Sequence, residues 1–298
     1  MRKRSGNSSL LLSLFLLMPA YDFSRSPSDD GDWTGQEIAS TELLQQMISN
    51  SRNVNSLEFS IKVIYRIQGE LIEKRGRFKL VNEPFRIYYK QDYPRKGMEI
   101  LYVDGKYNNR ILVNPNSFPW INFTLDPYGK LMTENRHQVI FEAGYRLIAD
   151  ILESILQKYS NDLDKIIRYH GTKVVNGTSN HHIVIEIPEF RYIHYTTREG
   201  ESIASIARKR GINGYMIVEN NPGIGSTRKN LGIRNIKIPN CYAKRFDFCI
   251  DKEKLIISSI KVYDEKGIFE SFEFIDVELN VPFHPQEFDH NFPEYGFW

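Results

Sequence analysis

The sequence predicts an α+β protein in which an antiparallel sheet of about ten strands curls into a half-barrel under a helical lid. Apolar and polar residues alternate over several stretches, which is typical of a sheet with one buried face. Residues 140–156 instead carry apolar residues every three or four positions, which is typical of an amphipathic helix. A sheet with one apolar face must curl or close to hide it, and we expect the helix to cover the hollow.

The first residues have the layout of a secretory signal peptide. Three basic residues at positions 2–4 precede an apolar run at 10–18. As a helix this run rises about 14 Å, which is too short to cross roughly 30 Å of hydrocarbon. We therefore expect residues 1–20 to be a signal peptide and 21–39 a disordered linker. The mature protein is expected to have no transmembrane span and to reach the periplasm or cell envelope of a Gram-negative bacterium.

Composition excludes some classes of function. The formal net charge is +2 over 298 residues, and the basic cluster at positions 2–4 supplies three of the positive charges. A chain this close to neutral is not a dedicated nucleic-acid binder, so we expect no nucleic-acid partner. No cofactor is expected.

The alternating stretches define the strands in chain order. A short helix at 41–49 precedes them. Asp104 and Gly105 stand between two such stretches, and an Asp-Gly pair there predicts a hairpin because glycine accepts positive φ. The predicted strands lie at 59–67, 78–80, 85–89, 100–103, 110–113, 121–125, 167–175, 181–187, 246–250, 256–263 and 269–279.

Residues 192–240 do not follow this alternation. They contain a strand, a turn at Gly200, a helix with an apolar side, a second helix ending at an Asn-Pro-Gly sequence, and a closing strand. This segment resembles a LysM module. In that family the outer strands pair side by side, which would bring Tyr192 and Asn240 together. We therefore expect the module to be inserted between the strands at 181–187 and 246–250, where it need not disturb the sheet.

LysM modules bind glycans that contain N-acetylglucosamine, chiefly peptidoglycan and chitin, so the resemblance implies peptidoglycan or a related glycan as a partner. In the family the groove lies between the first strand-helix turn and the loop after the second helix. Turn backbone groups there can bond an acetamido group. The alternative is a module retained only for packing. The corresponding residues are Glu199, Gly200, Glu201 and Ser202 on one wall, and Asn221, Pro222, Gly223 and Ile224 on the other.

The remaining chain, 40–191 and 241–298, resembles the domain-of-unknown-function family 1571. The resemblance covers nearly all of 40–298 outside the insert. That family is similar in outline to lipoprotein-localisation carriers, whose half-barrel holds acyl chains under a helical lid. It implies that the inner faces form an apolar cavity for a lipid or lipoprotein; otherwise they fill the core with side chains. The matching motifs are residues 66–86, 97–106 and 111–115, Arg136, His137, Glu142, Ala143 and Gly144, and the ending 279–297.

Known catalytic patterns are not apparent. The sequence has no His-Glu-x-x-His run and no glycine-rich phosphate loop. Arg136, His137 and Glu142 are more typical of a helix cap and salt bridge than of an acid–base set. His284 and His290 are better explained by an ordered C-terminal segment than by a metal site, so we expect no bound metal. The main hypothesis is a non-enzymatic envelope protein that binds peptidoglycan; lipid or lipoprotein carriage is the alternative, and a hydrolase with an unrecognised site is the third.

Cys241 and Cys249 are the only cysteines, and an even number in an exported protein suggests a disulfide. Eight extended positions span roughly 26 Å, whereas bridged Cα atoms lie within about 7 Å. The two can pair only if the chain turns between them, near residues 242–245. Both alternatives stay open.

Overall fold

The structure is a computed structural model that describes residues 33–118, 120–224 and 229–297. The expected signal peptide at 1–20 and residues 21–32 of the expected linker lie outside these ranges. Helix α1, Trp33–Asn53, begins within the last residues of the expected linker, 33–39. That stretch contains no proline that would interrupt a helix. The elements below belong to the unit formed by residues 34–298.

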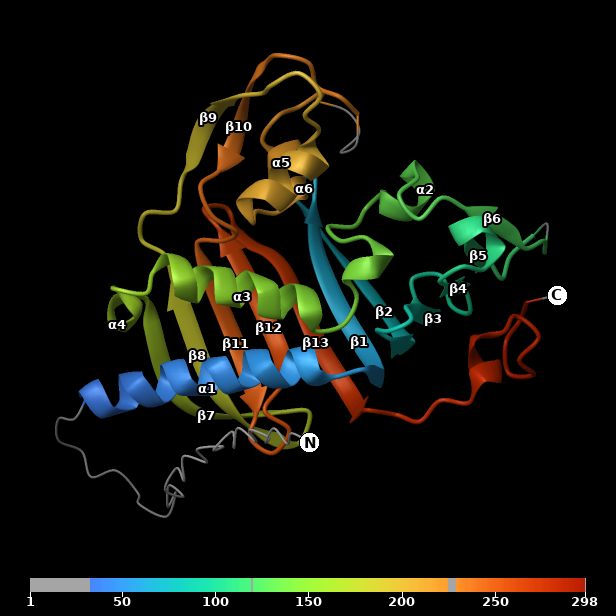
Figure 1. Cartoon of the computed structure of the whole chain (residues 1–298), viewed down its shortest axis with the longest axis horizontal. Coiled ribbons are helices and arrows are strands. Elements are labelled where there is room, and N and C mark those ends of the chain that lie inside the picture. Colours follow the sequence, from blue (N-terminus) through green and yellow to red (C-terminus); the bar gives the residue numbers. More distant parts are fainter. Residues whose placement is uncertain (1–32, 119, 225–228, 298) are drawn as a thin grey trace, which may run out of the picture. The chain divides into compact units, whose positions relative to one another are not determined.

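One antiparallel sheet of eleven strands dominates this unit (Figure 1). The predicted α+β class and large antiparallel sheet are confirmed, but the sheet is open, with β6 and β7 at its edges. Two meanders meet where the first strand, β1, pairs with the last, β13. The order is β6-β5-β4-β3-β2-β1-β13-β12-β11-β8-β7. The bounds are β1 Ser56–Ile67, β2 Glu70–Val81, β3 Arg86–Tyr93, β4 Glu99–Val103, β5 Ile111–Asn114, β6 Phe123–Leu125, β7 Ile167–Val175, β8 Thr178–Glu186, β11 Arg245–Asp251, β12 Ile257–Asp264 and β13 Gly267–Leu279.

The helix predicted over 140–156 is divided in two. A short 3-10 helix, η2 Ile140–Glu142, is followed by helix α3, Arg146–Lys158. Gly144 separates them with φ +84°, and a Cβ at this position would lie 2.9 Å from the Leu80 side chain. The predicted hairpin at Asp104 and Gly105 is present between β4 and β5. Shorter helices are η1 Tyr107–Asn109, α2 Lys130–Thr133, α4 Leu163–Ile166 and η3 Pro285–Phe288.

The main core lies between one face of the sheet and helices α1 and α3, which run across it (Figure 1). Alternate residues of β1 are buried, as the period of two predicts. Leu44 and Met47 of α1 and Leu152 of α3 complete this core, and each has no exposed surface. Burying a side chain of this size contributes about 1.5–3 kcal/mol.

The C-terminal residues pack against the opposite face of the sheet. The Tyr295 ring stacks on Tyr88 with centroids 3.7 Å apart, and Phe288 and Phe297 are buried with strand residues of β2 to β5. The Gly296 backbone N–H donates to Glu99 Oε2 at 2.7 Å. The end of the chain is therefore an ordered wrap over this face.

Residues 192–239 leave the sheet between β8 and β11, which pair with each other. They form strand β9 Tyr192–Thr196, helices α5 Ile203–Arg210 and α6 Gly214–Glu219, and strand β10 Asn235–Pro239. β9 and β10 pair, and the Arg191 N–H donates to Asn240 Oδ1 at 3.0 Å, so the two ends of this segment are adjacent. The segment has an apolar core of its own.

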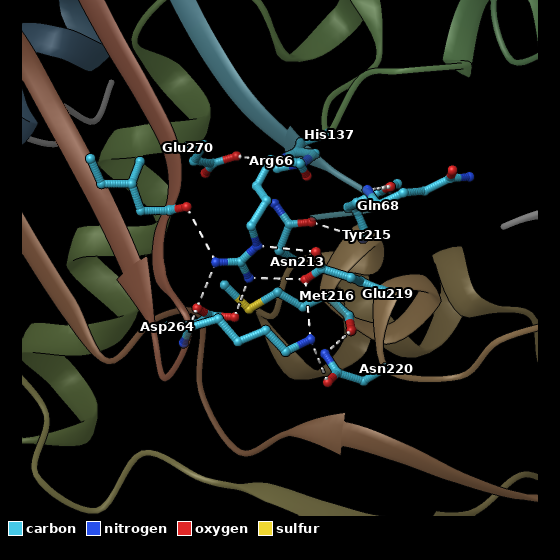
Figure 2. A network of polar contacts seen from close by, with 12 residues as sticks. Arg66, Gln68, His137, Asn213, Tyr215, Met216, Glu219, Asn220, Asp264 and Glu270 are labelled. Carbon is cyan, nitrogen blue, oxygen red and sulfur yellow. Dashed lines mark hydrogen bonds and ion pairs between the residues drawn. The ribbon is translucent and has the colours of Figure 1, made fainter. Parts of the chain in front are cut away.

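A buried ion network joins this inserted segment to the sheet (Figure 2). The Arg66 guanidinium, in β1, donates to both carboxylate oxygens of Asp264 at 2.9 and 2.5 Å. It also donates to both carboxylate oxygens of Glu219, in α6, at 3.0 and 2.9 Å. Burial opposes ionisation of Asp264, but the Arg66 hydrogen bonds outweigh it and hold its pKa below the ordinary value. Helix α6 is thus fixed to the end of the sheet.

The two cysteines are free and buried, so the disulfide that the sequence left open does not form in this structure. Cys241 packs in the main core. Cys249 lies between Phe248 and Ile250, which face that core, so its own side chain points to the opposite face of the sheet. The sheet itself separates the two sulfur atoms.

Replacing Arg66 with methionine tests the docking network. Arg66→Met removes the cation that bridges the buried carboxylates of Asp264 and Glu219 and leaves Glu219 with the partly exposed Lys266 at 3.7 Å, so we expect a loss of about 3–5 kcal/mol in the free energy of unfolding. Arg52→Met is the matched control, since Arg52 pairs with Asp150 and Glu153 at the surface. It should cost no more than about 1 kcal/mol. Urea unfolding measures both, and equal losses would contradict the assignment.

Thiol labelling tests the separation of the cysteines. Burial raises the pKa of Cys241 to about 11 and also raises the pKa of Cys249. Alkylation at pH 8 should therefore be slow in the native protein, and both thiols should react after unfolding in guanidinium. A chain that lacks two hydrogen atoms by intact mass and accepts no label after unfolding would show a disulfide instead.

Candidate functional site

A cavity of about 120 Å³ lies between the sheet and the segment that leads into α3. Its walls are mainly apolar and come from elements far apart in the chain. β1 to β4 and β11 to β13 supply one side, and α3 with the residues that precede it supplies the other. The apolar lining includes Phe59, Ile61 and Val63 of β1, Phe246, Ile260, Val262, Phe272 and Phe274 of the C-terminal strands, and Leu147, Ile148, Ile151 and Leu152 of α3.

Two glycines help to leave this space open. Gly144 and its neighbour Ala143 line the cavity where the predicted helix is interrupted. Gly76, in β2, lies under the Tyr89 ring, and a Cβ there would be 2.3 Å from the ring. Tyr89 can therefore lie across β2 and form part of the wall. A comparable apolar cavity engineered in another protein, about 150 Å³ in volume, stays dry and binds benzene.

One end of the cavity is polar: the buried Glu270 carboxylate has three side-chain donors there, whereas the Gln138 Oε1 atom has no hydrogen-bond partner among the described residues. The Glu270 carboxylate accepts hydrogen bonds from His137 at 2.8 Å, Gln138 at 2.8 Å and Tyr242 at 2.9 Å. The other ring nitrogen of His137 lies 3.0 Å from the Arg66 carbonyl oxygen. Both ring nitrogens of His137 thus lie opposite oxygen atoms, which fixes the orientation of the imidazole between Glu270 and the Arg66 carbonyl.

The predicted cap and salt bridge before α3 are present, but with different partners. Glu142 Oε2 accepts from the Val139 N–H at 2.8 Å and so caps η2. Burial raises the pKa of Glu142. His137 pairs with Glu270, a strand residue, and not with Glu142. The sequence could not show this partner because β13 lies more than a hundred residues away.

Two cations stand elsewhere in the lining, Lys74 and Arg136. The Lys74 ammonium donates to the Asn135 carbonyl at 2.6 Å and lies 5.8 Å from the centre of the Tyr65 ring. Burial and the positive charges of Arg136 and Arg95 lower the pKa of Lys74 to about 7. Our sequence prediction missed both residues as site residues. The sequence could have indicated Lys74, because it stands at an inward position of β2 between Ile72 and Phe78. Both of these residues pack on the core.

The residues predicted to form the first glycan wall lie in the turn between β9 and α5. Glu199 and Gly200 are exposed. Glu201 accepts from the Tyr195 hydroxyl at 2.9 Å and from the Arg198 N–H at 2.9 Å. Ser202 caps α5 by accepting from the Ser205 N–H at 3.2 Å. The last two side chains therefore already have structural partners.

The second predicted wall follows α6. Asn221 donates to the Ile217 and Lys237 carbonyls at 2.7 Å and accepts from the Lys237 N–H at 2.8 Å. Its side chain thus joins α6 to β10. Ile224 is buried in the core of the inserted segment, whereas Pro222 and Gly223 are exposed. The exposed surface offered by the eight predicted residues is mainly that of Glu199, Gly200, Pro222 and Gly223.

Within the described ranges, no group of three or more His, Cys, Asp or Glu side chains is placed to hold a metal ion. In the same part of the chain, no helix combines the length and apolar composition needed to span a membrane.

Several solved structures resemble this fold at low similarity. MucB, which has also been solved with MucA from Pseudomonas aeruginosa, has 10% identity and a TM-score of 0.42, over 84% of this chain and 62% of that chain. This chain thus spans under two thirds of MucB. The lipoprotein LppX of Mycobacterium tuberculosis has 12% identity and a TM-score of 0.38, over 83% and 98%. LprF of Mycobacterium bovis has 10% identity and a TM-score of 0.40, over 83% and 95%.

Comparison with curated proteins gave no match. The family model described as "Protein of unknown function (DUF1571)" matches residues 54–199. This range is shorter than the resemblance expected over 40–298. It covers β1 to β8, the segment before α3 and the start of the inserted segment. Both the cations and the apolar residues that β1 and α3 contribute to the cavity therefore lie within the part of the chain that matches this family.

Proposed function

We propose that this protein is an exported carrier or binding protein for a lipid or lipoprotein, and that it holds an acyl chain in the cavity between the sheet and α3. The observation that carries the proposal is the apolar lining of that cavity. Each buried methylene contributes about 0.8 kcal/mol, so even a partly enclosed chain would be held. Export rests on the signal-like residues 1–20. The protein acts by binding and not by catalysis.

A complete acyl chain needs more room than about 120 Å³. An engineered cavity of about 150 Å³ holds one benzene ring, so this smaller cavity holds no more than about six carbon atoms. We therefore infer that α3 moves away from the sheet when a chain enters. Gly144 supplies a hinge, and the ion pairs from Arg52 to Asp150 and Glu153, which tie α3 to α1, are exposed and weak.

A second candidate function is binding of peptidoglycan by residues 192–240, as the resemblance to a LysM module implies. It is supported by the exposed turn residues Glu199, Gly200, Pro222 and Gly223. The segment is firmly held on the sheet through Arg66 and Glu219. Glycan binding would place the carrier on the cell wall.

Filling the cavity tests lipid binding. Val63→Phe places a ring in the cavity, so we expect loss of any co-purified acyl chain in native mass spectrometry. The affinity for an apolar fluorescent probe such as N-phenylnaphthylamine should fall about tenfold or more. Val174→Phe is the matched control, because Val174 is 69% exposed on β7. Equal probe affinity in Val63→Phe and the wild type would contradict the proposal.

Blocking the exposed turns tests glycan binding. Pro222→Trp should reduce co-sedimentation of the full protein with purified peptidoglycan about tenfold if the turn contacts the glycan. Pro282→Trp, at an exposed position outside the inserted segment, should leave it unchanged. If the wild type stays in the supernatant, the glycan proposal fails while the lipid proposal is unaffected.

A further inference from the structure

The geometry points to an anionic headgroup on the ligand: we infer that Lys74 and Arg136 bind the carboxylate or phosphate of an amphiphile whose apolar chain occupies the cavity. This inference rests on the proposed lipid binding and deepens it by naming the charge of the ligand. The two cations and the apolar walls belong to the same cavity.

The position of Lys74 in β2 is unusual for a lysine. It pairs directly with Val63 of β1, and Val63 lines the cavity. Inward positions of β2 on either side of it hold Ile72, Phe78 and Leu80, which pack on the main core. A cation on this face is partly withdrawn from water, which disfavours the charged form unless an anion is near.

Nothing in the described part of the chain neutralises these cations. Neither Lys74 nor Arg136 is within ion-pair distance of a carboxylate among the described residues. The charges acting on Lys74 are those of Arg136 and Arg95, both positive, and with burial they lower its pKa to about 7. An anion beside the two would restore the charged lysine and relieve their mutual repulsion.

The acidic residues of the cavity are already occupied. Glu270 accepts from His137, Gln138 and Tyr242, and Glu142 accepts from the Val139 N–H. Among the residues that the structure describes, the Lys74 ammonium has one hydrogen-bond partner, the neutral Asn135 carbonyl. An ammonium has three donors, so Lys74 retains capacity for an oxyanion while holding Asn135.

Ligands with the same chain and different headgroups distinguish the contribution of the headgroup to the affinity from that of the chain. We would measure the affinities of oleate, oleyl alcohol and oleoyl lysophosphatidate at pH 7 by displacement of a fluorescent probe, using the full chain. The wild type should bind oleate about tenfold or more tightly than oleyl alcohol, because charge-assisted hydrogen bonds add to chain burial. Tighter binding of lysophosphatidate than oleate would identify a phosphate headgroup, and the reverse a carboxylate.

Lys74→Met and Arg136→Met should each weaken binding of the preferred anion about tenfold and leave oleyl alcohol within about twofold. Lys62→Met is the control, because Lys62 alternates with the cavity residues Ile61 and Val63 and faces the other side of the sheet. It should change neither affinity. The thermal midpoint of ligand-free Lys74→Met should hold or rise, which excludes misfolding as the cause.

Three results would overturn the inference. Equal affinities of the wild type for oleate, lysophosphatidate and oleyl alcohol would mean that the cavity binds the acyl chain but has no headgroup site. If both Lys74→Met and Arg136→Met keep the wild-type affinity for the preferred anion, other residues bind the anion. Binding of none of the ligands would remove the proposed function and the headgroup site together.

Discussion

The pairing of β1 with β13 is the constraint on which the rest of this structure depends. It joins two meanders into one sheet, and it places Val63 opposite Phe272 and Tyr65 opposite Glu270. The inward residues of both strands therefore form one continuous wall of the cavity. The same pairing brings Arg66 near the turn that holds Asp264, so the anchor of the inserted segment also depends on it. Without this contact between the ends of the chain, neither the cavity nor the docking of α6 would form.

The charges around the cavity fall into two groups with different consequences. Glu270 and Asp264 are buried with donors that satisfy them, and such groups contribute to a single defined arrangement of the elements they join. Lys74 and Arg136 have no carboxylate partner within the described residues, so their placement costs stability in the empty protein. Residues that break the local rule for a buried face are expected at functional sites. The two cations can therefore bind an anionic ligand, whereas the carboxylates already have partners within the protein.

Most of the sheet could be predicted from alternation, and the hairpin at Asp104 and Gly105 from its turn residues. The prediction of a continuous helix over 140–156 was wrong because the apolar period does not register a single glycine with positive φ, at which a Cβ would collide with Leu80. The structural role of Asn221 was also not visible, since its three hydrogen bonds reach Ile217 and Lys237 only after α6 and β10 come together. Alternation places Cys249 on the face opposite Phe248 and Ile250, but the position of Cys241 in the main core follows only from the folded chain.

Local conformation can be predicted from the sequence: which stretches are strands, which segment is an amphipathic helix, and where a segment of different pattern interrupts the sheet. These follow from the periods of apolar residues and from turn chemistry, which act between near neighbours. The pairing of the first and last strands and the docking of α6 through Glu219 become visible only in the folded chain. The same holds for the shared position of Lys74 and Arg136 in one apolar cavity. The physical reason is that such contacts join residues distant in sequence, whose partners are chosen by packing and charge pairing across the whole fold.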